Sequence, residues 1–261
     1  MPNLLAFDFQ GYFVLLLILT RVSGIIMTAP ILGSESVPPI IKIHFSLIIT
    51  LLVFNLVPPI NIDVNRLGSI ALLFLVGKEL LLGIFIGMIP RILVAAVGFA
   101  GDLVSFMMGM SMASIFDPAT SQQVQILSVF KNTILILVFL LLNAHYIIFE
   151  AIILSFQKVP IGGLKISQNL YDVYLRYIGD LFFIAMKISF PMILVLFLTN
   201  VILGFLTKSI PQLNVFIVGI PLTTLLGFLV FLFGIPVMVL VFQQLWDQNL
   251  TFLLDVINVI F

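Results

Sequence analysis

Long runs of apolar residues, interrupted by few charges, occupy most of this sequence and restrict the folds that it can adopt. About 20 apolar residues in an α-helix are needed to cross the hydrocarbon core of a bilayer. Since lipid offers the backbone no hydrogen-bond partner, a crossing segment of this kind must be helical. The sequence therefore predicts an all-α membrane protein with six hydrophobic, partly bent helical segments in a single membrane domain, residues 1–261. The segments lie at about 10–32, 40–60, 68–100, 124–157, 179–207 and 213–243, and a shorter amphipathic tail follows at 248–261.

The composition supports a membrane protein and excludes several classes of function. Hydrophobic residues make up 62% of the chain and charged residues 8%, with a mean hydropathy of +1.32, whereas about 25% of the residues of a soluble domain are charged. The formal net charge is zero, so no basic surface is available to bind nucleic acid by neutralising its phosphates. The chain contains no cysteine, which excludes disulfides, thiolate metal sites and thiol catalysis.

Prolines and glycines inside the longer segments predict bent or closely packed helices. The segment 68–100 would be about 50 Å long as one helix, against a hydrocarbon core of about 30 Å. We therefore expect a break or bend near Pro90, and bends in 179–207 and 213–243, which also contain prolines. Gly83 and Gly87 are spaced to let another helix backbone approach, although small residues are frequent in any membrane helix.

Six charged residues lie inside or at the rim of the apolar segments, where an unpaired charge costs at least about 2.5–3.5 kcal/mol. They form either an ion or proton path, or pairs between helices or with other subunits. Their scattered positions favour pairing, because they are not stacked along one helix face as a relay would be. Adjacent residues on a helix point to different faces, so Lys78 and Glu79 need separate partners. We assign an assembly role to Arg21, Lys78, Glu79 and Lys187, and the other two charges are Arg91 and Glu150.

No catalytic residue, metal site or cofactor is predicted, and the chain is not expected to be an enzyme. His44 and His145 are far apart, and neither has neighbours at the spacing of a metal site. Gly109, Ser111 and Ala113, with His145 later in the chain, superficially resemble a serine nucleophile motif. An alanine replaces the last glycine of that motif, however, and its strand–turn–helix context is missing. An intramembrane serine hydrolase is therefore the weakest of the alternatives.

A methionine-rich segment at 106–122 interrupts the helical pattern and reads FMMGMSMASIFDPATSQ. Methionine is flexible and polarizable, so a plug built from it conforms to an irregular passing surface and still excludes water when the passage is empty. The alternative is an ordinary soft packing contact. If the segment is a pore plug, its apolar bulk comes from Phe106, Met107, Met108, Met110, Met112, Ile115 and Phe116.

Several motifs resemble the FliR family of flagellar type III export-gate proteins, to which the SctT family of virulence injectisomes is related. The resemblance covers nearly the whole chain. Two departures are Met112, where family members often have phenylalanine, and Ala144, where they often have glycine. The motifs are Arg21 with TAPILGSESVP (28–38), GMSMASIFDPATSQ (109–122), LLNAHY (141–146) leading to SFQKVPIGG (155–163), and KSIPQLNVFIVGIPLT (208–223).

The resemblance implies a function as well as a fold. It implies bent helical hairpins, with a FliP-like part followed by a FliQ-like part. It also implies that the chain assembles with FliP and FliQ and is joined by FlhB. The assembly would lie in the lipid of the bacterial inner membrane, within the flagellar basal body. The assembly would form a closable conduit for unfolded flagellar subunits, with 106–122 as its plug and Met112, Ile115 and Phe116 in the sealing stretch.

The sequence therefore favours a component of the flagellar protein-export gate. The alternative from another class is a proton- or ion-coupled small-molecule transporter, since such proteins also combine broken helices with intramembrane charges. A transporter of that kind is expected to show matching breaks in its two halves. The methionine-rich break at 106–122 has no counterpart in the second half of the chain, which favours the export gate.

Overall fold

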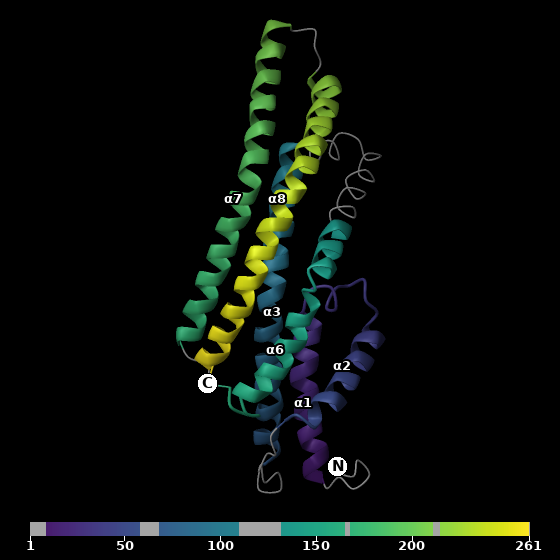
Figure 1. The fold of residues 1–261 in the computed structure, drawn as a ribbon, viewed down its shortest axis with the longest axis vertical. Coiled ribbons are helices and arrows are strands. Elements are labelled where there is room, and N and C mark those ends of the chain that lie inside the picture. The colour runs from purple at the N-terminus through teal and green to yellow at the C-terminus, as the bar shows by residue number, and fades with distance from the viewer. Residues whose placement is uncertain (1–8, 58–67, 110–131, 165–167, 211–214, 261) are drawn as a thin grey trace. The chain divides into compact units, whose positions relative to one another are not determined.

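The computed structural model describes residues 9–57, 68–109, 132–164, 168–210 and 215–260 (Figure 1). All of the regular structure within these ranges is helical, so the prediction of an all-α membrane protein is confirmed. The helices are α1 (Phe9–Thr28), α2 (Pro39–Phe54), α3 (Ser69–Met107), a short helix Asn132–Leu141, α6 (His145–Lys158), α7 (Gln168–Ser209) and α8 (Val215–Ile260).

Four helices of the described chain are long and apolar enough to cross a membrane: Gln10–Thr28, Ser69–Met107, Tyr171–Ser209 and Ile217–Leu253. The short helix Asn132–Leu141 and α6 together would make a fifth. The remaining predicted segment, 40–60, forms α2, which at 16 residues is shorter than the about 20 needed for a full crossing. Each of the six predicted segments thus contains helix in its described part, and these helices differ in length.

Helix ends coincide with prolines at Pro38 and Pro160, but the prolines inside the long segments do not break their helices. Pro90 lies inside the continuous helix α3, and Pro191, Pro221 and Pro236 lie inside α7 and α8. A proline removes one backbone hydrogen bond, a loss that membrane helices tolerate when their neighbours and local adjustments compensate. The break falls instead after Leu141, where the chain bends by 63° before α6. Asn143 adopts φ 54° there, a left-handed conformation that asparagine accepts more readily than most residues.

The chain divides into two compact units. Unit 1 contains residues 1–92, 143–176 and 248–261, and unit 2 contains residues 93–142 and 177–247. The first boundary, after Ile92, lies two residues beyond Pro90. The prediction of a single membrane domain over residues 1–261 stays a prediction.

In unit 1, α1 and α3 pack with their backbones in direct contact. A Cβ atom added to Gly83 would lie 2.3 Å from the carbonyl oxygen of Arg21, and one added to Gly24 would lie 2.9 Å from that of Leu80. A Cβ on Gly87 would lie 2.1 Å from the hydroxyl oxygen of Thr28. The close approach suggested by the spacing of Gly83 and Gly87 is therefore confirmed.

In unit 2, α7 and α8 form an antiparallel hairpin that packs against the second half of α3 (Figure 1). Gly234 of α8 makes room for Met192 of α7, whose Cε would lie 2.4 Å from an added Cβ. Phe99 and Phe182 join α3 to α7 with ring centroids 5.1 Å apart. The core of this unit therefore depends on small residues opposite methionine and on aromatic pairs.

Candidate functional site

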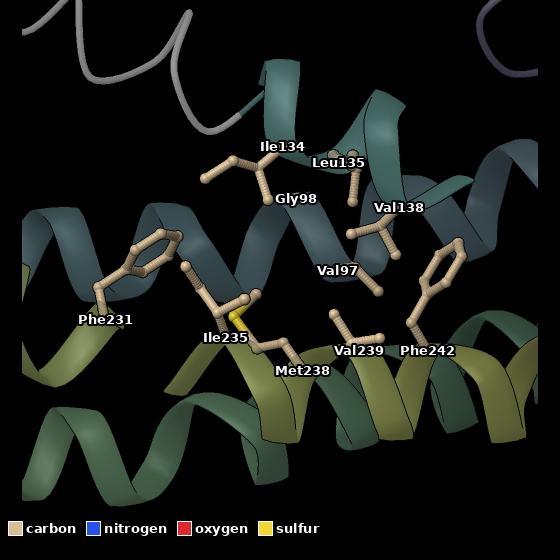
Figure 2. A pocket seen from close by; sticks show the side chains of 10 residues that line it. All are labelled: Val97, Gly98, Ile134, Leu135, Val138, Phe231, Ile235, Met238, Val239 and Phe242. Atoms are coloured by element: carbon tan, nitrogen blue, oxygen red, sulfur yellow. The ribbon is translucent and has the colours of Figure 1, made fainter. Parts of the chain in front are cut away.

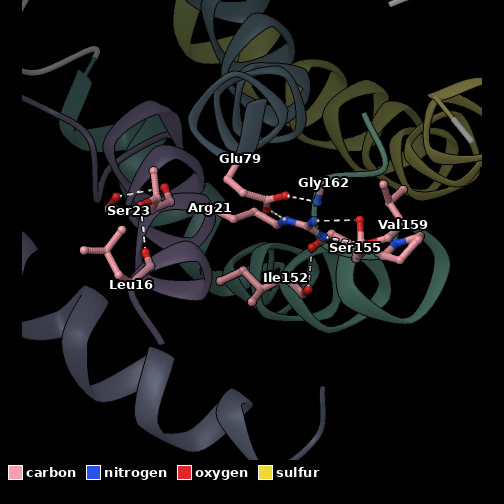
Figure 3. Close-up of polar contacts among 10 residues, drawn as sticks. Leu16, Arg21, Ser23, Glu79, Ile152, Ser155, Val159 and Gly162 are labelled. Atoms are coloured by element: carbon pink, nitrogen blue, oxygen red, sulfur yellow. Dashed lines mark hydrogen bonds and ion pairs between the residues drawn. The ribbon is translucent and has the colours of Figure 1, made fainter. Parts of the chain in front are cut away.

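A buried ion pair joins Arg21 of α1 to Glu79 of α3 in unit 1 (Figure 3). Arg21 Nε lies 2.5 Å from Glu79 Oε2, and both side chains are completely buried. The guanidinium carbon also lies 4.3 Å from the ring centroid of Phe156. A buried charge pair persists only when its remaining donors and acceptors are satisfied, and the surrounding contacts supply those partners.

Arg21 satisfies the carbonyl groups at the carboxyl end of α6. Its Nη1 donates to the carbonyl oxygens of Ser155 and Val159, each at 2.9 Å, and its Nη2 donates to that of Pro160 at 3.4 Å. The carbonyls of Ser155 and Pro160 also accept backbone N–H bonds, from Val159 and Gly163, so Arg21 is a second donor to each of them. A cation at the carboxyl end of a helix also complements the helix dipole. Arg21 therefore caps α6 as well as neutralising Glu79.

Glu79 holds the turn that follows α6. Its Oε1 accepts a hydrogen bond of 2.7 Å from the backbone N–H of Gly162, which adopts φ +79°. This backbone conformation favours glycine, and a Cβ there would lie 2.9 Å from Cδ2 of Leu75. The sequence motif VPIGG is thus held by two side chains. Arg21 donates to the carbonyl groups of Val159 and Pro160, and Glu79 accepts from the backbone N–H of Gly162.

The other intramembrane charges are exposed. Lys78 is exposed although its neighbour Glu79 is completely buried, which confirms that the two residues lie on different faces of α3. Arg91, Glu150 and Lys187 are also exposed. No ion pair joins any of these four exposed residues to another residue in the described parts of the chain. Of the proposed assembly charges, Arg21 and Glu79 therefore pair with each other, and Lys78 and Lys187 form no ion pair with any described residue.

The methionine-rich segment begins at the carboxyl end of α3, inside unit 2. Phe106 and Met107 belong to the last turn of this helix rather than to a non-helical loop, and Phe106 is exposed. The helix stops because Gly109 adopts φ +76°, and the N–H of Gly109 donates to the carbonyl of Phe106 at 3.0 Å. A glycine in this conformation is a common helix terminator.

Two side chains from the hairpin bind the carbonyl groups at this helix end. Thr223 Oγ1 of α8 lies 3.0 Å from the carbonyl oxygen of Met108 and shares its one proton with the carbonyls of Gly219 and Ile220, at 2.9 and 3.1 Å. Asn200 Nδ2 of α7 donates to the carbonyl oxygen of Met107 at 3.3 Å. These carbonyls lack partners within α3 because the helix ends there. The start of the methionine-rich segment is therefore attached to both α7 and α8.

Met108 packs as part of the core. It is buried against Val104, Met192 and Leu196, and a Cβ added to Gly227 of α8 would lie 2.3 Å from its Cγ. The alternative of a soft packing contact therefore describes Met108 well. The other predicted plug residues Met110, Met112, Ile115 and Phe116 lie outside the described residues, so the plug stays a prediction.

A small cavity of about 30 Å³ lies in unit 2 (Figure 2). A space of this volume holds one or two water molecules but no larger ligand. Its lining is entirely apolar, which disfavours even water. We regard it as a packing defect, and its lining residues are Val97, Gly98, Ile134, Leu135, Val138, Phe231, Ile235, Met238, Val239 and Phe242.

The residues of the hydrolase alternative fall partly outside the described part of the chain. His145 lies at the start of α6 in unit 1, and its buried Nδ1 has no hydrogen-bond partner there. His44 lies on α2, where its Nδ1 is 2.7 Å from the carbonyl oxygen of Ile40. Ser111 lies outside the described residues. No group of three His, Cys, Asp or Glu side chains that could hold a metal ion occurs among the described residues.

Sequence reasoning did not identify the contacts of Asn200, Thr223, Gly162 and Gly227. Thr223 and Gly162 do fall within motifs that were recognised, KSIPQLNVFIVGIPLT and SFQKVPIGG. Their positions therefore carried a signal, but a polar or small residue in a motif does not identify the carbonyl group or side chain that it contacts.

Comparison with known proteins agrees with these motifs. The family described as "Bacterial export proteins, family 1" matches residues 12–249. The flagellar biosynthetic protein FliR of Bacillus subtilis is 30% identical over 243 residues, covering 90% of this chain and 91% of the relative. FliR of Escherichia coli is 30% identical over 241 residues (92% and 91%), and FliR of Aquifex aeolicus is 29% identical over 222 residues (85% and 85%). The chain therefore belongs to the bacterial export proteins of family 1, as a FliR-type component of the flagellar export apparatus.

Proposed function

We propose that this chain assembles with FliP and FliQ, and with FlhB beside them, into a closable conduit that passes unfolded flagellar subunits across the bacterial inner membrane at the flagellar basal body. Its own contribution is to shape the conduit and close it. This role involves no bond making or breaking, so it requires neither a catalytic group nor a cofactor.

Exposed cations on the apolar helices are the main observation in favour of partner subunits. Lys78, Arg91 and Lys187 are exposed on long apolar helices and form no ion pair with any other described residue. A charge within a membrane helix usually faces the interior of a helix bundle and pairs there. Arg21 and Glu79 obey this rule inside the chain, whereas the exposed cations need counter-charges from elsewhere. Partner subunits of the same complex are the natural source.

The attachment of the end of α3 supports a role in closing the conduit. A movable plug needs a fixed base, and the contacts of Thr223, Asn200 and Gly227 hold the residues just before Gly109. The apolar residues from Met110 onward then supply bulk for a seal. Dewetting of a narrow apolar constriction is sufficient to block ions without a charged gate.

Co-purification tests the assembly directly. The tagged chain would be expressed with and without FliP and FliQ from the same bacterium, and the detergent-solubilised products compared by size and subunit content. We expect a hetero-oligomer when the partners are present and an unstable or aggregating product when they are absent, because the exposed charges then lack partners. A stable monomer that does not bind FliP or FliQ would contradict the proposal.

Membership of the export-protein family argues against the alternative of a small-molecule transporter. The buried ion pair gives that alternative no support either. Among the described contacts, the charged groups of Arg21 and Glu79 meet each other, the Phe156 ring and backbone groups, and a proton relay would need further titratable side chains in reach.

A further inference from the structure

Helix α7 has one buried and one exposed face within unit 2. The buried stripe contains Leu181, Ala185, Ile188, Met192, Leu196 and Leu203. Residues that follow one another at alternating spacings of four and three positions share one face of a helix. Such a set of exposed residues, starting at Phe183, lies on the face of α7 opposite the buried stripe. We call this exposed stripe the α7 seam, and its members are Phe183, Lys187, Phe190, Leu194, Phe197 and Val201.

The α7 seam follows a seven-residue repeat. Phe183, Phe190 and Phe197 occupy one position of the repeat and are 70%, 61% and 53% exposed. Lys187, Leu194 and Val201 occupy the position four residues later. Apolar residues at these two positions of a heptad form the contact line between packed helices. The seam therefore has the pattern of a helix–helix contact whose second helix is not supplied by the described residues.

Lys187 is the charged residue of this stripe. It lies near the middle of α7, with Phe183 one turn before it and Phe190 one turn after it. Neighbouring aromatic rings and a long helix on either side make this an unfavourable place for an unpaired ammonium group. Charges within membrane helices are generally turned toward a bundle interior, yet Lys187 is turned away from the core of its own unit. The described residues do not complete the interior that it faces.

The exposed face of α8 provides a contrast in the same unit. It carries large exposed residues such as Ile217, Leu225, Phe233 and Leu240, and α8 has no charged residue from Val215 to Trp246. A face of this composition is suited to lipid. The exposed face of α7 therefore contains a charged residue, as a protein contact does, whereas the exposed face of α8 contains none, as a lipid contact does.

We propose that the α7 seam packs against a helix of another membrane subunit and that this helix places an aspartate or glutamate opposite Lys187. The inference rests on the proposed function, because it requires an assembly of several membrane subunits, and it specifies the chemistry of the partner at one position. Leu and Phe side chains of the seam supply the packing, and the ion pair fixes the register of the two helices, as a single polar group does in a coiled coil.

Photo-cross-linking in the assembled complex distinguishes a protein partner from lipid. The cross-linking amino acid p-benzoylphenylalanine would replace Phe190 in the seam and, as a matched control, Phe233 on α8, which is also a highly exposed phenylalanine. We expect the Phe190 probe to react with a membrane helix of another subunit, within about one turn of a carboxylate, and the Phe233 probe to react with lipid. Lipid adducts alone at Phe190, or a protein segment without an acidic residue, would overturn the proposal.

Charge substitutions provide the second measurement. Lys187→Arg keeps the charge and is expected to leave co-purification unchanged, whereas Lys187→Glu is expected to reduce the yield of complex about tenfold or more. A lysine in place of the cross-linked carboxylate should restore assembly with the Lys187→Glu chain. Normal assembly of the Lys187→Glu chain alone would refute the ion pair.

The results also separate this inference from the proposed function. If the wild-type chain co-purifies with its partners while the Phe190 probe reacts only with lipid, the seam assignment is wrong and the proposed assembly stands. If the wild-type chain binds no membrane subunit, both are wrong.

Discussion

The guanidinium of Arg21 and the carboxylate of Glu79 lie 2.5 Å apart with no solvent exposure, and together they connect α1, α3 and the turn after α6. Residues separated by 58 positions in the sequence thus form one polar centre inside an apolar unit. The pair stabilises the unit only as long as both members are present, because either charge alone would be buried without a partner.

Removal of one member of this pair is predicted to be strongly destabilising. Arg21→Met or Glu79→Gln should lower the free energy of unfolding by about 3–5 kcal/mol, measured by thermal or denaturant unfolding of the purified complex. Glu35→Gln is the matched control, because it makes the same chemical change at an exposed carboxylate outside the apolar segments and should have little effect. An unfolding transition of the Glu79→Gln chain equal to that of the wild type would show that the pair does not stabilise unit 1.

Contact between the backbones of α1 and α3 predicts opposite effects for two glycine substitutions in one helix. Gly83→Ala should destabilise unit 1, because the added Cβ would lie 2.3 Å from the carbonyl oxygen of Arg21 and 3.0 Å from Cα of Gly24. Gly77→Ala meets no atom within 4 Å and should be neutral or stabilising by up to about 1 kcal/mol through helix propensity. Thermal stability of the two variants would be compared, and equal shifts would contradict the close approach.

The contact between Met108 and Gly227 predicts a clash that a second substitution relieves. Gly227→Ala should destabilise unit 2, because its Cβ would lie within 2.7 Å of three atoms of Met108. In the double variant with Met108→Ala that steric conflict disappears, so the two changes together should cost less than the sum of the single changes. Unfolding measurements on the four chains of this cycle provide the test, and simple additivity would show that the two residues do not interact.

The hydrogen bond from Thr223 to the end of α3 predicts a smaller effect. Thr223→Val keeps the shape of the side chain but removes the single proton that Oγ1 shares between the Met108 carbonyl and the carbonyls of Gly219 and Ile220. The cost should therefore lie near the lower end of about 1–3 kcal/mol. Thr199→Val removes an exposed hydroxyl that bonds to a carbonyl of its own helix, and it should cost less. Hydrogen exchange of the amides near Met108 would report the loosening, and it should be unchanged in the Thr199 variant.

The proposed plug predicts a leak without loss of assembly. Replacement of Met112 and Phe116 by serine should leave the complex intact but make the membrane permeable to ions and small solutes, because polar side chains no longer exclude water from the constriction. Conductance of reconstituted complexes would measure the change. Wild-type conductance in an assembled variant would place the seal in another subunit, and the methionine-rich segment would then be a packing contact.

Much of the local structure follows from the sequence, because apolar length alone requires helices in lipid. Each of the six apolar segments contains helix in its described part, and the spacing of Gly83 and Gly87 indicated a close helix contact. Proline did not predict the breaks inside the long segments. Pro90 and Pro191 lie in continuous helices, whereas a break occurs near Asn143, because the neighbours of a proline decide whether the helix survives the loss of one hydrogen bond. The predicted bends at these prolines stay predictions.

The sequence by itself determined the class of the protein, its helical segments, its family motifs and the set of charges that needed partners. Only the tertiary structure decided which charges pair, because pairing depends on how helices distant in sequence are brought together. It places Arg21 beside Glu79 and turns Lys187 outward, although the sequence presents both cations in the same way, as single charges in apolar surroundings. The physical reason is that a charge inside an apolar helix must be matched, but the match is made across space, by α3 and α6 for Arg21 and, as we propose, by another subunit for Lys187.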